Sequence, residues 1–427
     1  MSTRPAESRR LTLKEAGERH FEVIIPAERY RLRVPGLLLT LEADQLHWKS
    51  GELHGQLEVS LDLHGVATLD GTADSSSMNF SRLADRHSRA SALGALSKTP
   101  EYPWGELLQL FSLHLLKAER DGDPGVDLRD VELDPSITTS EEVLGLPIAR
   151  YDPIMLVAKG GDGKSLLALR ILGDLNRRGF QVGFLDNEWN EIVHRDRLGK
   201  QFDSPLPSVH YLRLQRPFTI EAPRVRRFVH ERGLDFVAVD SVGLGTDGPM
   251  EYSEAPLAFG RAIRSLGRIG SILLSHTKHD ATDGTNKRPY GSPYWLNLCR
   301  DVWYLKSAES GPGRLEALLE NIKVNAGARR QPVALRFEFG ERIRIERVST
   351  GDLDELSDSL PIRDRIVATM KRRGAISIDD LADDLDAKRD SVKKAIHRDL
   401  QKVFIRVETI GGETKTVKYG LLERRTA

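Results

Sequence analysis

The chain has 427 residues, of which 39% are hydrophobic and 30% are charged, and its 63 basic residues balance 63 acidic ones. This length exceeds one ordinary hydrophobic core, so we expect two or three domains with the composition of a soluble globular protein. No apolar run approaches the roughly 18 residues of a membrane span, the polar first residues are unlike a secretory signal, and Cys299 is the only cysteine. We therefore expect a cytoplasmic protein without disulfides, a cysteine-cluster metal site or a membrane partner. The zero net charge neither supports nor excludes nucleic acid.

Residues 1–120 predict a β-rich α+β domain, to which the sequence assigns no role. Between Phe21 and Gly71 apolar and polar residues alternate in short runs, which is the period of half-buried antiparallel strands. Helical patterns follow at 81–96 and 104–117. Residues 121–142 are acidic and have no periodicity, so we expect a linker there.

Residues 143–350 predict an α/β domain, because strand-like runs alternate with helical ones. This alternation is typical of βαβ units, which build a mostly parallel sheet with helices on both faces. The expected strands are 154–157, 182–185, 209–214, 236–239, 272–274 and 302–305.

A phosphate-binding loop follows the first of these strands. Residues 158–165 read Ala-Lys-Gly-Gly-Asp-Gly-Lys-Ser and open an apolar helix, which is the strand, loop and helix context that such a loop requires. Small residues let backbone N–H groups close around phosphates, and the helix N-terminus adds its positive dipole. Lys164 would reach the β- and γ-phosphates of ATP, and the Ser165 hydroxyl would bind Mg²⁺. The residues expected to contact the nucleotide are Lys159, Gly160, Gly161, Asp162, Gly163, Lys164, Ser165 and Leu166.

Acidic residues at the ends of two later strands complete the expected ATPase site. Asp240 ends the apolar strand 236–239 and would hold the Mg²⁺ shell through water, although a helix cap or turn is the alternative role. No glutamate follows Asp240 directly, so the base that activates water must come from another strand. The strand from 182 leads to Glu188, which we expect to be the general base, with Asp186 as the alternative.

Together these residues resemble the RecA/DnaB-like superfamily of P-loop ATPases, and within it the hexameric replicative helicases of the plasmid RepA type. The resemblance covers about 146–346 and includes the loop, in which a non-glycine first position is also normal for that family. Glu188 stands where the RecA-like branch places the glutamate that polarises water. Further matches follow in order at Asp240, Leu273–His276, Gly291–Ser292, Arg300–Trp303 and Lys323–Gly327.

The resemblance implies three more catalytic roles. His276, at a strand end, would be the sensor of the γ-phosphate, unless it is an ordinary core histidine. Arg300 would be an arginine finger delivered to a neighbouring subunit, unless it forms a structural ion pair. Lys323 would belong to an element near the subunit interface, unless it is simply solvated.

Basic residues in a polar loop suggest a first contact with DNA. In the resembled family the loop equivalent to 277–289 lines a central channel and grips single-stranded nucleic acid, which basic residues do through phosphates. The candidate residues are Lys278, Lys287 and Arg288. An ordinary surface loop is the alternative.

The C-terminal residues predict a winged helix-turn-helix behind an acidic linker at 351–360. Residues 361–427 contain three helical segments and two strands, and their sixteen basic and eleven acidic residues give a net charge of +5. A recognition helix facing duplex DNA is expected, with a protein-docking module as the alternative. Its candidate DNA contacts are Arg389, Lys393, Lys394 and Arg398.

The function that these expectations support is an ATP-driven DNA helicase that moves along single-stranded DNA. The resemblance implies a homo-oligomeric ring, a hexamer, with a primase or polymerase as partner. Two alternatives stay open at this point: an ATP-dependent assembly factor, such as a recombinase or loader, and a DNA-binding regulator that ATP switches.

Overall fold

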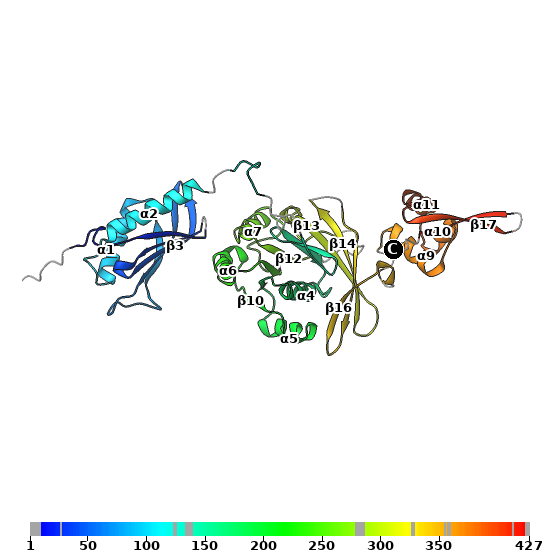
Figure 1. The fold of residues 1–427 in the computed structure, drawn as a ribbon, viewed down its shortest axis with the longest axis horizontal. Coiled ribbons are helices and arrows are strands. Elements are labelled where there is room, and N and C mark those ends of the chain that lie inside the picture. The colour runs from blue at the N-terminus through cyan, green and yellow to red at the C-terminus, as the bar shows by residue number, and fades with distance from the viewer. Residues whose placement is uncertain are drawn as a thin grey trace, which may run out of the picture. The chain divides into compact units, whose positions relative to one another are not determined.

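A computed structural model describes residues 10–25, 28–122, 126–132, 140–277, 287–325, 329–353, 356, 360–411 and 414–422. The chain divides into two compact units, Met1–Leu133 and Asp134–Ala427 (Figure 1). Among the described residues, no helix combines the length and the apolar character that a membrane crossing requires.

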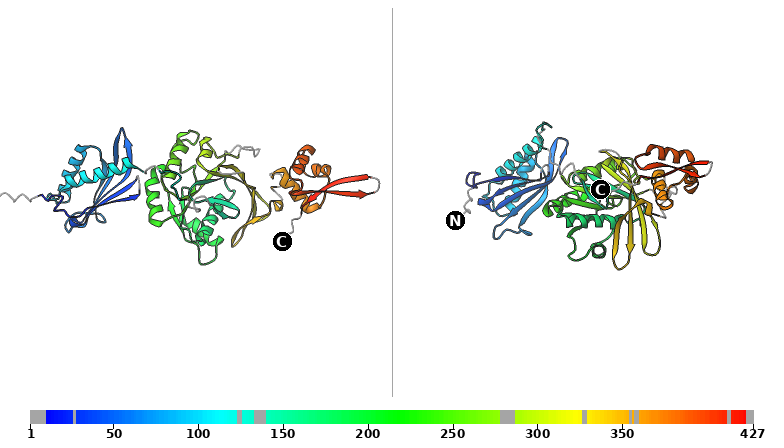
Figure 2. Two further views of the ribbon diagram at one scale, coloured as in Figure 1. Left: turned by 45° about the horizontal axis from the view of Figure 1, so that its top comes forward. Right: turned by 45° about the vertical axis from the view of Figure 1, so that its right-hand side comes forward.

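The first unit is a five-stranded antiparallel sheet covered by two helices (Figure 2). Along the fourth strand every second side chain is buried, which confirms the alternation predicted from the sequence. The second helix buries Trp104, Leu107, Leu108, Phe111 and Leu115, a helical spacing that turns one face to the sheet. In sheet order the strands are β1 (His20–Ile25), β2 (Arg29–Val34), β3 (Leu39–Lys49), β4 (Glu52–Leu61) and β5 (Thr72–Asn79), and the helices are α1 (Leu83–Leu96) and α2 (Trp104–Asp121).

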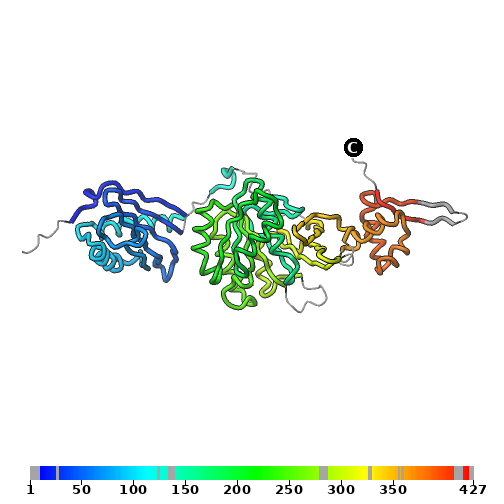
Figure 3. Tube along the Cα trace, turned by 90° about the horizontal axis from the view of Figure 1, so that it is seen from below, coloured from blue at the N-terminus to red at the C-terminus, as the bar shows by residue number. Residues whose placement is uncertain are grey.

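The second unit is built on a nine-stranded sheet in the order β10-β9-β11-β12-β8-β13-β14-β15-β16. Figure 1 labels several of these strands, and Figure 3 follows the Cα trace of the unit from another side. The first six strands of the sheet in this order are parallel, and the last three run antiparallel. The predicted fold class, a mostly parallel α/β sheet in one unit and a β-rich α+β fold in the other, is confirmed. The parallel strands are β8 (Pro153–Ala158), β9 (Val182–Asp186), β10 (Val209–Arg213), β11 (Phe236–Asp240), β12 (Gly270–His276) and β13 (Asp301–Glu309).

The antiparallel strands were not expected from the sequence. They are β14 (Arg314–Val324), β15 (Val333–Phe339) and β16 (Ile343–Val348). A hairpin of β6 (Ser140–Val143) and β7 (Leu146–Ala149) precedes the sheet and adds apolar residues to its core.

Helices cover both faces of the parallel strands. Side chains alternate along β8, so that Leu156 joins one apolar cluster and Met155 joins the other. Helices α4 and α5 pack in the first cluster, whereas α6, α7 and α8 pack in the second. Their bounds are α4 (Lys164–Arg177), α5 (Glu191–Gln201), α6 (Phe218–Arg232), α7 (Glu254–Arg264) and α8 (Tyr294–Leu298).

The predicted acidic linker carries a buried apolar stripe. Leu353, Leu356 and Leu360 form a cluster with Leu318 and Ala334 of the antiparallel strands. The leucines repeat every three or four residues among acids, so charge dominated the sequence pattern although the apolar side chains are buried.

The C-terminal residues form three helices and a hairpin, in the order expected from the sequence. They have a core of their own, in which Ile366, Leu381, Val392, Ile396 and Phe404 are buried. The elements are α9 (Ile362–Arg373), α10 (Ile378–Asp384), α11 (Arg389–Arg398), β17 (Phe404–Gly411) and β18 (Thr414–Leu421). The winged-helix interpretation and its domain boundary stay predictions.

Candidate nucleotide site

Four neighbouring parallel strands end at one edge of the large sheet, which we call the carboxyl edge. Ligands bind at this edge in open α/β sheets, because the loops after the strands converge there. The loop after β8 leads into Lys164 at the start of α4, β9 leads to Glu188, β11 ends in Asp240, and β12 ends in His276. The structure therefore brings four of the predicted site residues together.

The phosphate-binding loop is held in shape by one of its own side chains. The Asp162 carboxylate accepts hydrogen bonds from the Lys159 backbone N–H at 2.9 Å and from the Ser307 hydroxyl at 2.8 Å. Gly161 and Gly163 have φ angles of 87° and 89°, which side chains rarely adopt. Asp162 therefore shapes the loop, and Ser307 is a supporting residue that no local motif indicated.

Of the residues around the start of α4, some contact groups of the site and others pack against the core. A Cβ at Gly163 would lie 3.2 Å from the Phe337 ring, so β15 also restricts this position to glycine. Ser165 hydrogen-bonds the Asp240 carboxylate. Leu166 packs against the apolar core, and its carbonyl accepts a hydrogen bond from Gln201. Gly160 has open space around it, as a backbone that approaches phosphates requires.

The Lys164 side chain is buried beside the loop. Its Nζ donates to the carbonyls of Ala158 at 3.2 Å and Lys159 at 2.8 Å, and it lies 3.4 Å from His276 Nδ1. Burial lowers the pKa of Lys164, while the negative charges of Asp240, Asp162 and Glu188 oppose that shift. An anionic ligand would offset the desolvation of this ammonium, which fits a phosphate-binding role.

Asp240 is buried, and its Oδ2 has no hydrogen-bond partner among the described residues. Burial raises the pKa of this carboxyl to about 6, and the nearby Glu188 and Asp186 add to the shift against the hydrogen bond from Ser165. A buried carboxylate oxygen without a partner, beside a hydroxyl, fits a hard divalent cation, so Asp240 and Ser165 would hold Mg²⁺. Such an ion supplies charge neutralisation to phosphate oxygens when it is bound.

The two candidates for the general base differ sharply in their surroundings. Asp186 is fully buried and accepts four hydrogen bonds, from the backbone N–H groups of Glu188 and Trp189 and from the His194 and Tyr211 side chains. Burial opposes its ionisation, but these bonds prevail and lower its pKa to about 2. Asp186 is therefore a structural anchor of the loop after β9.

Glu188 keeps a freer carboxylate at the same edge. Its Oε1 lies 3.5 Å from His276 Nε2, and its side chain is 22% exposed. The contact with His276 lowers the pKa of Glu188. His276 thus bridges Glu188 and Lys164, because its other ring nitrogen faces the lysine. This position suits a residue that couples phosphate to the loop after β12.

Arg300 and Lys323 lie at the opposite edge of the sheet, which we call the amino edge. The Arg300 backbone N–H donates to the Pro153 carbonyl, where β8 begins. Pro153 and the loop are five residues apart on β8, and a strand advances about 3.3 Å per residue, so Arg300 lies about 16 Å from its own loop. Arg300 cannot reach that site, and its guanidinium pairs with Asp152 at 3.2 Å.

Lys323 has a packing role at the amino edge. Its Nζ donates to the carbonyls of Leu296 at 2.6 Å and Cys299 at 2.8 Å, at the C-terminal end of α8. These carbonyls lack partners within the helix, and a cation there also complements the helix dipole. Burial lowers the pKa of Lys323.

Some of the residues predicted to contact DNA are exposed, and others already form ion pairs. Lys278 lies outside the described residues. Lys287 donates to both carboxylate oxygens of Glu320, at 2.7 and 2.6 Å, and the Arg389 guanidinium pairs with Asp379. The exposed cations are Arg288, Lys393, Lys394 and Arg398.

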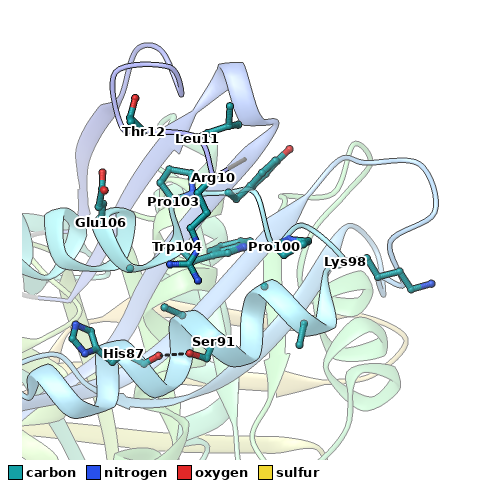
Figure 4. A pocket seen from close by; sticks show the side chains of 15 residues that line it. Arg10, Leu11, Thr12, His87, Ser91, Lys98, Pro100, Pro103, Trp104 and Glu106 are labelled. Carbon is teal, nitrogen blue, oxygen red and sulfur yellow. Dashed lines mark hydrogen bonds between the residues drawn. The ribbon is translucent and has the colours of Figure 1, made fainter. Parts of the chain in front are cut away.

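A hollow of about 1020 Å³ in the first unit is separate from this chemistry (Figure 4). It lies between α1, the start of α2 and residues 10–12, and Trp104 forms part of its wall. The Trp104 indole donates to the Thr99 carbonyl at 3.2 Å, so this ring is fixed by the fold. None of the predicted site residues lines the hollow.

No protein-family model and no curated protein sequence matches this chain. The chain is similar to the solved structure of a KaiC-like protein from Pyrococcus horikoshii, with 12% identity over 47% of this chain and 91% of that one, and a TM-score of 0.37. It is also similar to the flagellar accessory protein FlaH from Methanocaldococcus jannaschii, with 14% identity over 48% of this chain and 92% of that one, and a TM-score of 0.36. The fold and site above rest on this chain's own strand order and side-chain geometry.

Proposed function

We propose that this chain is an ATP-dependent DNA translocase and helicase, which hydrolyses ATP at the interfaces of a homo-oligomeric ring. The observation that carries the proposal is the division of the site between two edges of one sheet. The carboxyl edge gathers Lys164, Asp240 and Glu188, whereas Arg300 lies about 16 Å away, at about 3.3 Å per strand residue. A catalytic arginine placed there must act on the nucleotide of another subunit.

Each residue of the carboxyl edge has a distinct task in this proposal. Lys164 binds the β- and γ-phosphates, and Ser165 and Asp240 hold the metal. Glu188 accepts the proton of the attacking water, because its carboxylate is ionised and faces the open edge. His276 contacts both Glu188 and Lys164, so its position depends on whether phosphate is bound.

The neighbouring subunit supplies the remaining positive charge through Arg300. A guanidinium is permanently charged and binds two phosphate oxygens at once. In the isolated chain the Arg300 side chain is 62% exposed, and its Nε pairs with Asp152, so it can exchange this carboxylate for a phosphate. Rings of six subunits are proposed from the resemblance to RepA-type helicases, as is a primase or polymerase partner.

The DNA part of the proposal rests on exposed cations. Arg288 precedes Pro289, which pairs with Thr277 just after the end of β12, so it lies near the edge of the nucleotide site, where hydrolysis can move it. Lys393, Lys394 and Arg398 lie exposed on α11, the expected recognition helix for duplex DNA. These side chains would bind phosphates, so DNA affinity should fall with salt.

The test of the motor is ATP hydrolysis with and without single-stranded DNA, together with unwinding of forked duplexes of both polarities. We expect stimulation by DNA and strand separation on one fork polarity. Replacing Lys393 and Lys394 by alanine should weaken duplex binding and preserve stimulation, while Lys371→Ala on α9 serves as the matched control. Stimulation without unwinding on either fork would favour the ATP-dependent assembly factor, and no effect of DNA would contradict the DNA motor.

The interface is tested by mixing two inactive variants. Arg300→Ala subunits keep the nucleotide edge, and Lys164→Ala subunits keep Arg300. If Arg300 acts on a neighbour, mixed rings should regain part of the turnover that both variants lose. Mixed oligomers that stay inactive would show that Arg300 serves only the structure of its own subunit.

The assembly factor is the second candidate, and the state of Lys287 favours it. This lysine is fully engaged by Glu320, so it offers no free charge to a translocating strand. The loop would then grip DNA with fewer cations than the sequence suggested.

A further inference from the structure

A basic hollow of about 550 Å³ opens at the amino edge of the large sheet. Its charged and amide side chains come from the segment before β8, the end of α7, the end of α8 and the residues after β14. The charged and amide residues that line it are Asp152, Arg264, Arg268, Asn297, Arg300 and Asn325.

The fold fixes the backbone around this hollow. Ile263 and Ile269 are buried in the core, and Gly267 turns the chain between them with a φ angle of 93°. Arg264 and Arg268 flank that turn and are exposed. On the other side, the Asn325 backbone N–H donates to the Arg300 carbonyl at 3.1 Å, which ties the end of β14 to the start of β13.

The hollow has an excess of positive charge. Three guanidinium groups face one carboxylate, that of Asp152, which pairs with Arg300. Arg264 and Arg268 have no ion-pair partner among the described residues. Arginines that share a hollow repel one another unless an anion separates them, and arginine is the side chain best suited to phosphate oxygens. A volume of about 550 Å³ is also within the range of ligand pockets, roughly 300–1,000 Å³.

We propose that this hollow is the half-site that receives the triphosphate of the nucleotide bound by the next copy of the chain, and that Arg264 and Arg268 bind it together with Arg300. This inference rests on the proposed function and extends it to two residues that no motif indicated. The hollow lies where β8 and β12 begin, whereas the chain's own phosphate loop lies where β8 ends. The anion therefore comes from another subunit, and the contact is head to tail.

Asp152 is the carboxylate that Arg300 would exchange for the neighbour's phosphates. It holds Arg300 at 3.2 Å in the isolated chain and neutralises one of the three arginines. When the neighbour's phosphates enter, Arg300 exchanges one anionic partner for another, while Arg264 and Arg268 gain the anionic partner that they lack among the described residues.

The experiment compares steady-state ATP hydrolysis, nucleotide affinity and oligomer size in full-length variants. Arg264→Ala with Arg268→Ala should lower kcat by about tenfold or more, because two charge-assisted contacts to the neighbour's triphosphate are lost. Binding of a fluorescent ATP analogue should stay within about threefold, because each chain's own phosphate loop is untouched. Arg261→Ala, on the same helix but outside the hollow, is the matched control and should leave all three measurements unchanged.

Mixing separates this inference from the proposed function. The double variant combined with Lys164→Ala subunits should regain turnover, because each mixed interface pairs an intact loop with an intact hollow. Unchanged kcat in the double variant, or lost kcat without regain in mixed oligomers, would overturn the role of the hollow. Lost DNA affinity with normal basal kcat would assign the arginines to DNA instead. If Arg300→Ala is also not rescued by Lys164→Ala, the interface ATPase itself has failed.

Discussion

Both edges of the large sheet carry charged side chains, but the two edges bury them to different degrees. At the carboxyl edge Lys164 and Asp240 are buried, the lysine against two carbonyls and the carboxylate with one oxygen unpaired among the described residues. At the amino edge Arg264, Arg268 and Arg300 are exposed around a hollow. Buried charge is costly without a ligand, whereas exposed charge is not.

Under the proposed function, this difference gives the two edges different roles. The carboxyl edge would be preorganised for phosphate and metal, because its groups are already desolvated and held in place by the fold. The amino edge has cations that water still solvates, so it gains its strength only when a neighbour covers it. Under the proposed function, a single chain would therefore contribute halves of two different sites.

Lys164→Ala should have the largest effect of the substitutions that test the difference between the two edges. It removes the buried cation of the phosphate loop, and we expect ATP turnover to fall by about 10³-fold, because a charge-assisted contact to the phosphates is lost in a preorganised site. Steady-state ATPase assays measure the effect. Lys159→Ala, in the same loop but with an exposed side chain, should change turnover by less than about threefold, since Lys159 serves the loop through its backbone. A large loss of turnover with Lys159→Ala would show that the Lys159 side chain, and not only its backbone, contributes to the site.

Glu188→Gln and Asp186→Asn should separate catalysis from structure within the carboxyl edge. Glu188→Gln should lower turnover by about 10²-fold or more and preserve nucleotide binding, because it removes a general base and keeps its volume. Asp186→Asn should lower the free energy of unfolding by about 2 kcal/mol, because an amide cannot accept all four hydrogen bonds. Urea denaturation and single-turnover hydrolysis measure the two effects. If Glu188→Gln hydrolyses ATP at the normal rate, another group is the general base.

Asp240→Asn tests whether the buried negative charge at the carboxyl edge destabilises the nucleotide-free protein. The folded pKa of Asp240, about 6, exceeds its ordinary value of 3.8, so its contribution to stability is full below pH 4 and is lost as pH rises through 6. The nucleotide-free variant should therefore be more stable than the wild type at pH 8, by on the order of 1–3 kcal/mol, and equal to it near pH 4. Urea denaturation across pH 4–8 tests this. A stability difference that does not change with pH would contradict the buried, unpaired carboxylate.

Lys323→Met tests the amino edge, with the smallest expected effect. The substitution keeps the aliphatic stem and removes two hydrogen bonds to the end of α8, so we expect a loss of about 1–2 kcal/mol in the free energy of unfolding. Turnover per folded subunit should stay near the wild-type value, in contrast to Arg300→Ala. A loss of turnover without a loss of stability would make Lys323 a functional group of the interface.

Much of the nucleotide edge was predictable from local sequence. A glycine-rich loop between an apolar strand and an apolar helix has few other structures, and strands that alternate with helices must run parallel. The ends of parallel strands meet at one edge, so residues as distant as Lys164 and His276 were expected together and are 3.4 Å apart. The antiparallel strands β14 to β16 were missed, because they extend the sheet without a helical segment between them.

What only the tertiary structure decided is which side chains already have partners. Asp186 and Glu188 are two residues apart after the same strand, and spacing alone left both as candidates for the base. His194 and Tyr211 hydrogen-bond the Asp186 carboxylate. Lys287 donates to Glu320, which is 33 residues further along the chain. Arg264, Arg268 and Arg300 line one hollow, although β12 and α8 separate Arg300 from the other two in the sequence. Sequence periodicity reports which face of an element is buried, but the pairing of polar groups depends on segments that only the folded sheet brings together.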